Sequence, residues 1–317
     1  MKILALDVGG TAVKSAIIDR DNQICDIRVS PSSPAPAPDL VRHAVRVAKE
    51  YVDYDVLAVS MTGQIDHLTQ TVRFRSDVGD GSKVEYPVGE ILHDAVQHPV
   101  FVINDSNAAA LAEGCFGAGR GWRDFLCLTY GTGVGGGIVL DRKLLTGRSG
   151  IAGEVGHMVT HAGGLPCKCG HGGCYQQYAS VTALVQQARE LVPDLENARQ
   201  LFDRLAALPE LQRVVDEWIG EIVEGLASLA YTFDPECFVL GGGVMEREDV
   251  LTQIRSRFAE RVMQSFSKVQ IVQAQLGNRA GMFGAAAYAR WALEHPEDCS
   301  RIGCFMGEQI NPNRTGE

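Results

Sequence analysis

Hydrophobic and polar positions near the amino terminus alternate in two short stretches. Residues 2–8 read KILALDV and residues 13–19 read VKSAIID, with glycines and a threonine between them. A two-residue period is typical of half-buried strands, so the stretches predict a β-hairpin with a glycine-rich turn.

The same pattern returns later in the chain. Residues 126–142, LCLTYGTGVGGGIVLDR, align without a gap on residues 4–20. The identical positions are Leu4, Leu6, Gly9, Asp19 and Arg20, which meet Leu126, Leu128, Gly131, Asp141 and Arg142. Each copy predicts strand, turn and strand, and the repeat predicts two lobes of related design.

Further elements follow from apolar periodicity and from capping and turn residues. The expected helices are 39–51, 87–97, 106–117, 211–233, 247–265 and 279–294, and one or two further helices are expected within 181–208. Ser106 or Asp105 is the expected cap of the helix at 106–117. The expected further strands are 55–63, 100–105 and 237–241, and the expected loops are 30–38 and 147–174. Residues 72–87 are turn-rich and stay unassigned.

Strands followed by helices predict an α/β protein with two lobes. We expect a smaller lobe at 1–112, a larger lobe at 113–294 and a polar, loosely ordered tail at 295–317. Ligands of such folds bind at the carboxyl ends of strands.

Charge and composition narrow the class of partner. The 317-residue chain carries a net charge of -10, which argues against nucleic acid and anionic membranes as partners. The start MKILALDVGG does not read as a signal peptide, and no apolar run approaches the ~20 residues of a membrane span. We therefore expect a cytoplasmic protein whose nine cysteines are reduced, so that clustered cysteines indicate a metal site before disulfides.

Three glycine-rich turns follow expected strands. They comprise Gly9, Gly10 and Thr11; Gly131, Thr132, Gly133 and 135–137; and Gly241, Gly242 and Gly243. Backbone N–H groups in such turns can hold phosphates, although each turn alone would fit an ordinary hairpin. The G-x-G-x-x-G at 131–136 is not a dinucleotide fingerprint, because a strand rather than a helix is expected after it, and no G-K-[S/T] sequence occurs.

Two acidic positions lie at expected strand ends. Asp7 beside the first turn is a candidate Mg²⁺ partner through water, or a strand-end residue that satisfies turn amides. Asp105 is either a helix cap or a general base for phosphoryl transfer. Asn104 beside it can donate to and accept from the hydroxyls of a polyol.

The densest local signal is a set of cysteines in a glycine-rich loop. Cys167, Cys169 and Cys174 form C-x-C-x4-C, and His157 precedes them by ten residues. Three thiolates and an imidazole are typical of a structural zinc site, with His161 and His171 as rival ligands. The other cysteines are expected to be core or near-core (Cys25, Cys115, Cys127, Cys237) or incidental in the tail (Cys299, Cys304).

Taken together, these segments resemble the ROK family of sugar kinases and sugar-responsive repressors, from Leu4 to about Arg290. The motifs that carry the resemblance are DVGGT, NDSNAAALAE, GTGVGGG, GEVGH and CKCGHGGC. The resemblance implies the actin-like (hexokinase/ribonuclease H-like) ATPase fold, a structural zinc, Mg-ATP as co-substrate and a homodimer.

The resemblance also implies roles for individual residues. Mg-ATP would be bound at the first turn, by Asp7, Gly9, Gly10 and Thr11. A second contact with the phosphates would come from Thr132 and Gly133. The adenosine would be bound by Gly241, Gly242 and Gly243. Asp105 would activate the 6-hydroxyl of a sugar, and Gly63, Asn104, Glu154 and His157 would contact that sugar. His157 would share the zinc with Cys167, Cys169 and Cys174.

Three departures from the family pattern bear on the sugar. Gln176 stands where the family usually has Glu near the anomeric hydroxyl, Thr62 and Gly63 replace the common Pro-Gly, and 75–86 lacks the usual Asn and Trp. We therefore expect an ATP-dependent hexose kinase acting on glucose or an N-acylhexosamine such as N-acetylmannosamine. One alternative is a kinase of C1-substituted glucose. The other is a non-catalytic sugar-sensing regulator, but we expect no DNA-binding domain in this sequence, which argues against a repressor.

Overall fold

The computed structural model describes residues 1–32, 37–75, 83–295 and 301–303. The chain forms two compact units, each built from separate segments. The first unit comprises Met1–Gly121, Gly137–Gly153 and the segment that begins at Asn278, and the second comprises Trp122–Gly136 and Glu154–Gly277. The helix expected at 279–294 thus belongs to the same unit as the amino-terminal strands.

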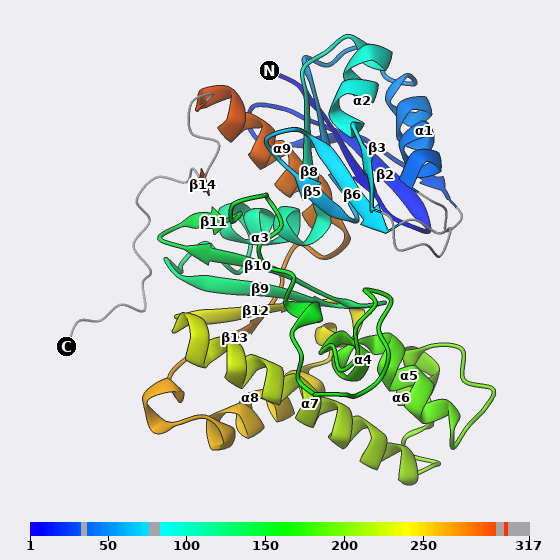
Figure 1. The fold of residues 1–317 in the computed structure, drawn as a ribbon, viewed down its shortest axis with the longest axis vertical. Coiled ribbons are helices and arrows are strands. Elements are labelled where there is room, and N and C mark those ends of the chain that lie inside the picture. The colour runs from blue at the N-terminus through cyan, green and yellow to red at the C-terminus, as the bar shows by residue number, and fades with distance from the viewer. Residues whose placement is uncertain (33–36, 76–82, 296–300, 304–317) are drawn as a thin grey trace. The chain divides into compact units, whose positions relative to one another are not determined.

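A five-stranded sheet organises the first unit (Figure 1). Its order is β3 (Ile24–Pro31), β2 (Ala12–Ile18), β1 (Ile3–Val8), β4 (Val56–Met61) and β8 (Val100–Asn104). Strands β1 and β2 form the predicted antiparallel hairpin, whereas β1, β4 and β8 run parallel. Their three carboxyl ends therefore share one edge of the sheet.

Helices cover both faces of this sheet (Figure 1). Helices α1 (Ala37–Ala48) and α2 (Val88–Val96) pack on the face that presents Leu4, Leu6 and Val8. Helix α9 (Ala280–Glu294) contacts β1, β4 and β8 and also packs on α3 (Asp105–Phe116). The α3–α9 crossing requires glycine at 284, because a Cβ there would lie 1.8 Å from the Ala108 carbonyl oxygen.

The first unit also contains shorter strands. The region left unassigned forms β6 (Thr71–Arg75) and β7 (Lys83–Tyr86), which pair antiparallel with each other, and β6 also pairs with β5 (Gln64–Asp66). Strand β11 (Lys143–Leu145) pairs with β10 (Val134–Leu140) and with β14 (Arg301–Gly303). A loosely ordered tail is therefore wrong for 301–303, because backbone pairing with β11 holds that segment.

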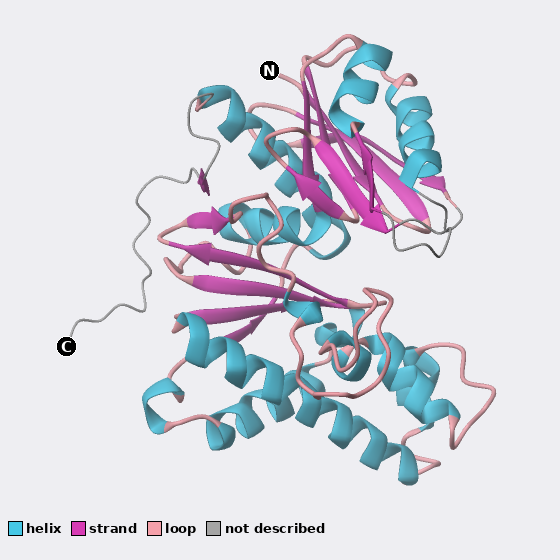
Figure 2. Ribbon diagram, viewed as in Figure 1, coloured by secondary structure: helices cyan, strands magenta, loops and turns pink. Residues whose placement is uncertain are grey.

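The second unit combines three parallel strands with helices (Figure 2). Strand β12 (Cys237–Gly241) pairs with β9 (Phe125–Tyr130) and β13 (Gln270–Gln273). The helices are α4 (Gln176–Ala179), α5 (Val181–Arg189), α6 (Ala198–Arg204), α7 (Glu210–Phe233) and α8 (Glu248–Arg261). Single 3₁₀ turns of this unit are η1 (Val155–His157), η2 (Gly243–Glu246) and η3 (Gln264–Phe266). A fourth, η4 (Gly277–Arg279), begins at the last residue of this unit and continues into the first unit.

The predicted repeat is confirmed at the level of single residues. Strands β1 and β9 begin at Ile3 and Phe125 and end at Val8 and Tyr130, which are equivalent positions of the alignment. Strands β2 and β10 match in the same way, so β10 continues past the glycines as a strand and not as a helix. Within the described part of the chain, no helix has both the length and the apolar character needed to cross a membrane.

Candidate active site

Asn104 lies where strand β8 ends and joins two neighbouring segments. Its side-chain Nδ2 donates to the carbonyl oxygen of Gly63 at 2.9 Å, just after β4. Its Oδ1 accepts from the backbone N–H groups of Ser106 at 2.9 Å and Asn107 at 3.1 Å. Asn104 is therefore the N-cap of α3, and the prediction of Asp105 or Ser106 as the cap is wrong by one or two positions. The reason is local: Asn104 is still extended, whereas Asp105 is already the first helical residue.

Asp105 is held at the first position of α3. Its Oδ1 accepts from Asn104 Nδ2 at 3.1 Å, from the Ser106 backbone N–H at 2.8 Å and from Ser106 Oγ at 3.4 Å. A carboxyl group fixed by a helix start and by the neighbouring cap has a defined orientation at the carboxyl edge of the sheet. This is the arrangement that a positioned proton acceptor requires.

Asp7 occupies the same edge, on β1. Its Oδ2 lies 3.6 Å from Lys14 Nζ, and its Oδ1 accepts from Ser60 Oγ at 3.2 Å. Lys14 Nζ also donates to Asn278 Oδ1 at 3.1 Å. Burial raises the pKa of Asp7, and Lys14 and Ser60 oppose that rise. The carboxylate is thus incompletely compensated, which is a setting that a cation would relieve.

The backbone of α9 approaches Asp7 closely. A Cβ added at Gly281, in the first turn of the helix, would lie 2.4 Å from Asp7 Oδ1. Sequence reasoning missed Gly281 and Ser60, which reach Asp7 from distant parts of the chain, and Asn278, which contacts Lys14. It also missed Lys14, although the register of the predicted hairpin places this residue opposite Asp7. For the approach of α9, the sequence signal is a small residue at the start of an otherwise regular helix.

The first glycine turn is closed by its own backbone. The Gly9 N–H donates to Ala12 O at 3.0 Å, and Ser32 donates from Oγ to Gly9 O at 3.1 Å and from its N–H to Thr11 O at 2.9 Å. A Cβ added at Gly10 would meet no atom within 4 Å. Packing therefore does not require glycine at position 10, and the bare backbone leaves room for a ligand.

The second and third turns lie on neighbouring strands. The Gly131 N–H donates to Gly133 O at 3.0 Å, and Gly241 is aligned with Thr129 in the β12–β9 pair. Gly242 has φ +109°, and a Cβ there would lie 2.0 Å from Tyr130 O, so the fold requires this glycine. Gly131 and Gly243 have open space instead, as Gly10 does. Thr132 is exposed between Gly131 and Gly133.

Four side chains in the second unit form a possible metal centre. One ligand atom from each of His157, Cys167, Cys169 and Cys174 lies within 4.8 Å of the others. Cys169 Sγ and Cys174 Sγ are 3.5 Å apart, and His157 Nδ1 is 3.7 Å from Cys167 Sγ. The donor set of three thiols and one imidazole fits a closed tetrahedral site.

The rival histidines lie outside this cluster. His161 stacks on Tyr178 with ring centroids 3.9 Å apart, and its Nε2 lies 3.5 Å from Glu221 Oε1. His171 contributes its backbone carbonyl, which accepts from the Cys167 N–H at 2.7 Å.

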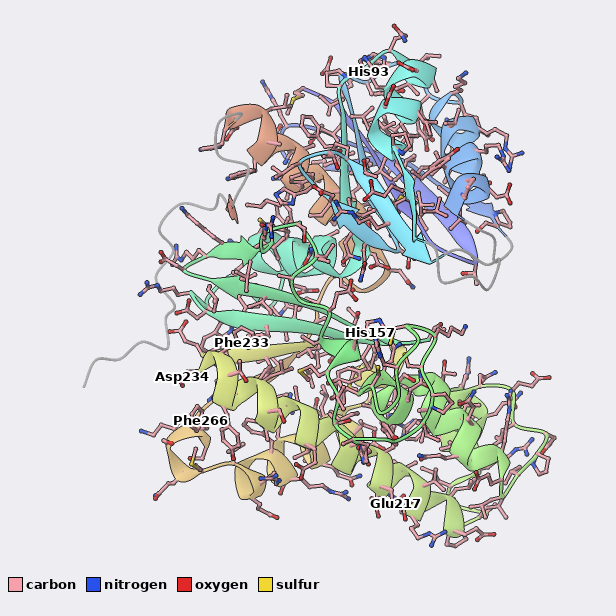
Figure 3. All side chains as sticks on the ribbon, viewed as in Figure 1. His93, His157, Glu217, Phe233, Asp234 and Phe266 are labelled. Atoms are coloured by element: carbon pink, nitrogen blue, oxygen red, sulfur yellow. The ribbon has the colours of Figure 1, made fainter. Side chains whose placement is uncertain are left out.

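His157, labelled in Figure 3, presents its two ring nitrogens to different groups. Nδ1 faces the thiols, whereas Nε2 lies 3.8 Å from Glu154 Oε2. Burial raises the pKa of Glu154, and His157 opposes that rise. The ring thus connects the cysteine cluster to the carboxyl group of Glu154, whose side chain is 38% exposed.

The thiols differ in their readiness to ionise. Burial opposes ionisation of Cys167, but hydrogen bonds from Cys169 and from Gln176 and Gln177 outweigh it and lower its pKa to about 6. Burial and the two neighbouring thiols raise the pKa of Cys174 to about 12. A metal bound here would be held by the deprotonated form of the cysteines, so its binding would release protons.

Gln176 starts α4 beside both the cluster and the second glycine turn. Its Nε2 lies 3.4 Å from Cys167 Sγ, and a Cβ added at Gly133 would lie 2.6 Å from its Oε1.

The remaining cysteine predictions divide. Cys115, Cys127 and Cys237 are buried, as predicted, but Cys25 is exposed. Its prediction as core was wrong because β3 is the edge strand of its sheet and mostly exposed. Cys299, Cys304 and positions 76–82 of the 75–86 segment lie outside the described residues.

Comparison with known proteins places the chain in a family. The ROK family model matches residues 3–292. A glucokinase of Streptomyces coelicolor is 33% identical over 315 residues, covering 90% of this chain and 97% of the relative. An N-acetylmannosamine kinase of Salmonella heidelberg is 31% identical over 293 residues, covering 92% and 99%.

A solved structure agrees with these relatives. The ROK family glucokinase of Streptomyces griseus, in complex with glucose and AMPPNP, is 34% identical with a TM-score of 0.79 and covers 92% of this chain and 99% of its own. The predicted α/β class and actin-like fold are confirmed by this similarity. The family match spans nearly the whole chain, and the chain belongs to the ROK family.

Proposed function

We propose that the protein is an ATP-dependent hexose kinase that transfers the γ-phosphate of Mg-ATP to the 6-hydroxyl of the sugar. The observation that carries the proposal is the placement of Asp105, fixed at a helix start next to Asn104 and Gly63 at the carboxyl edge of a parallel sheet. The relatives that are named as glucokinase and N-acetylmannosamine kinase support the same reaction class.

Asp105 is the general base in this proposal. Its carboxylate accepts the proton of the 6-hydroxyl as the oxygen attacks the γ-phosphorus and the bond to the β-phosphate oxygen breaks. Phosphoryl transfer relies mainly on position and electrostatics, so the main contribution of Asp105 is to orient and activate the acceptor. Gly63, Asn104, Glu154 and His157 are the proposed sugar contacts, with Gln176 near C1.

The glycine turns are the proposed nucleotide-binding groups. Gly9, Gly10, Thr11, Thr132 and Gly133 would offer backbone and hydroxyl donors to the phosphates, and Gly241–Gly243 would lie along the adenosine. Gly10 and Gly243 support this role, because no packing contact explains their lack of a side chain. Gly242 is instead explained by the fold itself.

Two metals fit the residues present. Asp7, partly buried and only partly compensated by Lys14, fits a Mg²⁺ ion held through water, which would neutralise phosphate charge. The cluster of His157 and three cysteines fits a structural Zn²⁺, which would fix the 147–174 loop and the His157 ring. The resemblance also supports a homodimer, which light scattering of the purified protein would test. The composition supports a cytoplasmic location.

The identity of the phosphorylated oxygen tests the reaction. Wild-type protein is incubated with Mg-ATP and either glucose or 6-deoxyglucose, and the product is examined by ³¹P NMR. We expect a phosphate monoester on C6 of glucose and no sugar-dependent ADP with 6-deoxyglucose. ADP formation at equal rates with both sugars would contradict the proposal.

A further inference from the structure

Gln176 is proposed to lie near C1 of the sugar and takes no part in the transfer of the phosphoryl group, yet its side chain has close protein neighbours of its own. It is the first residue of α4 and follows Cys174, the last cysteine of the cluster, by two positions. Its Nε2 lies 3.4 Å from Cys167 Sγ, within the range of a hydrogen bond to sulfur. This contact links the helix start to the first cysteine of the cluster.

The Cys167 sulfur has two polar neighbours from other parts of the chain. Gln176 Nε2 lies 3.4 Å from it and His157 Nδ1 lies 3.7 Å from it. A sulfur that accepts a hydrogen bond is suited to carry negative charge, as a metal-bound thiolate does. The ligands of a metal are commonly oriented and tuned by such outer contacts.

The chemistry of the two amide atoms fixes which one faces the sulfur. An amide N–H attracts a thiolate, whereas an amide oxygen or a carboxylate in the same place would repel it. The amide oxygen of Gln176, Oε1, lies close to two glycines. A Cβ at Gly133 would lie 2.6 Å from Oε1, and one at Gly156 would lie 3.3 Å from it.

Gly133 and Gly156 therefore leave space for the amide oxygen. Gly156 is restricted further, since a Cβ there would lie 2.1 Å from Val134 O. The Gln176 side chain thus lies between the cysteine cluster on one side and the second glycine turn on the other. A residue in this place couples the position of the cluster to that of the turn.

We infer that Gln176 is a positioning residue of the metal centre, whose amide donates an N–H···S hydrogen bond to the Cys167 thiolate while its oxygen packs against Gly133. This inference rests on the metal site of the proposed function. It also explains what Gln in place of the usual family Glu changes at position 176, because a carboxylate there cannot donate the N–H···S hydrogen bond to Cys167.

Cobalt substitution tests the hydrogen bond directly. The full-length protein is loaded with Co²⁺, and the sulfur-to-cobalt charge-transfer band is recorded for wild type, Gln176→Met and Gln176→Glu. Gln176→Met keeps the approximate size without a donor, and Gln176→Glu replaces the donor with a charge. The control is Gln264→Glu, which makes the same change at an exposed position of the same unit. Circular dichroism verifies the fold of each variant.

Loss of the donor makes the sulfur more electron-rich, so we expect the band to move to lower energy in both Gln176 variants. Zinc release to a chelator should become roughly tenfold faster in them and stay unchanged in Gln264→Glu. A wild-type spectrum and release rate in both folded Gln176 variants would overturn the inference while leaving the metal site intact. A wild-type chain that binds neither zinc nor cobalt would instead overturn the proposed metal site, and this inference with it.

Discussion

The Nε2 atom of His157 lies 3.8 Å from the Oε2 atom of Glu154, while Nδ1 of the same ring faces Cys167. A metal bound at Nδ1 would fix the ring plane and leave Nε2 on the side of the carboxyl group. The His157 ring therefore links the cysteine cluster to Glu154, which is one of the proposed sugar contacts. In the proposed reaction a structural metal would matter through this ring, although it would take no chemical part.

Metal removal is the first prediction. Chelation of zinc, or Cys169→Ser, should lower the melting temperature by roughly 5 °C, since about 1–2 kcal/mol of stability would be lost. It should also raise the KM for the sugar, because His157 loses its fixed orientation. Scanning calorimetry and steady-state kinetics measure the two effects. Cys25→Ser, at an exposed thiol outside the cluster, is the control and should change neither.

Replacement of the proposed base is the second prediction. Asp105→Asn should keep the cap made by Asn104 and bind sugar and zinc, while kcat falls by about 10²–10⁴. Coupled measurement of ADP release gives kcat, and sugar-dependent thermal stabilisation reports binding. Asp94→Asn, at an exposed position of α2, should have wild-type kinetics. Near-normal turnover in Asp105→Asn would exclude Asp105 as the base.

The third prediction concerns Asp7 and pH. Burial raises the pKa of Asp7, so the folded chain binds this proton more readily than the unfolded chain. The contribution to stability is present below the unfolded pKa and is lost as the pH rises through the folded pKa. Asp7→Asn should therefore raise the melting temperature of the ligand-free protein at neutral pH, and the gain should shrink as the pH is lowered.

The same variant should lose its response to nucleotide. Mg-ATP at 100 times its Kd would stabilise the wild type by about 2.7 kcal/mol, and Asp7→Asn should show little of this effect. Thermal melts with and without Mg-ATP provide the measurement. Equal stabilisation of both proteins would show that Asp7 does not serve the nucleotide.

A pair of glycine substitutions is the fourth prediction. Gly281→Ala places a Cβ 2.4 Å from Asp7 Oδ1, so the carboxyl group or α9 must shift, and Mg-ATP binding should weaken about tenfold or more. Gly220→Ala lies inside α7 with no atom within 4 Å of the new Cβ. It should stabilise the protein by about 0.5–1 kcal/mol and leave nucleotide binding unchanged. Equal nucleotide affinity in the two variants would contradict the account of Gly281.

Much of the fold could be read from local pattern. The repeat located β1, β2, β9 and β10, and apolar periodicity predicted a helix at 211–233, where α7 forms. Strand β3 was missed because an exposed edge strand shows no clear alternation, and β13 because it has only 4 residues. The placement of α9 against β1 and β4 depends on contacts between distant segments, which one sequence does not display.

The site divides in the same way. Cysteine spacing predicted the cluster, because its ligands come from one loop, and the distances then separated His157 from His161 and His171. The surroundings of Asp7 could not be predicted in full, because Ser60 reaches it from another segment and Asn278 reaches its neighbour Lys14 from a third. Asn104 was identified as a site residue from the sequence, but the N-cap of α3 was assigned to its neighbours Asp105 and Ser106.

The most direct test of the central claim is ADP release from Mg-ATP across a panel of sugars. The panel contains glucose, N-acetylmannosamine, N-acetylglucosamine, mannose, allose, fructose and cellobiose, with zinc-loaded, folded protein. We expect sugar-dependent turnover with at least one hexose, and the comparison of glucose with cellobiose would show whether C1 of the sugar must be free. No turnover with any of these sugars would contradict the kinase assignment and favour a sugar-sensing regulator.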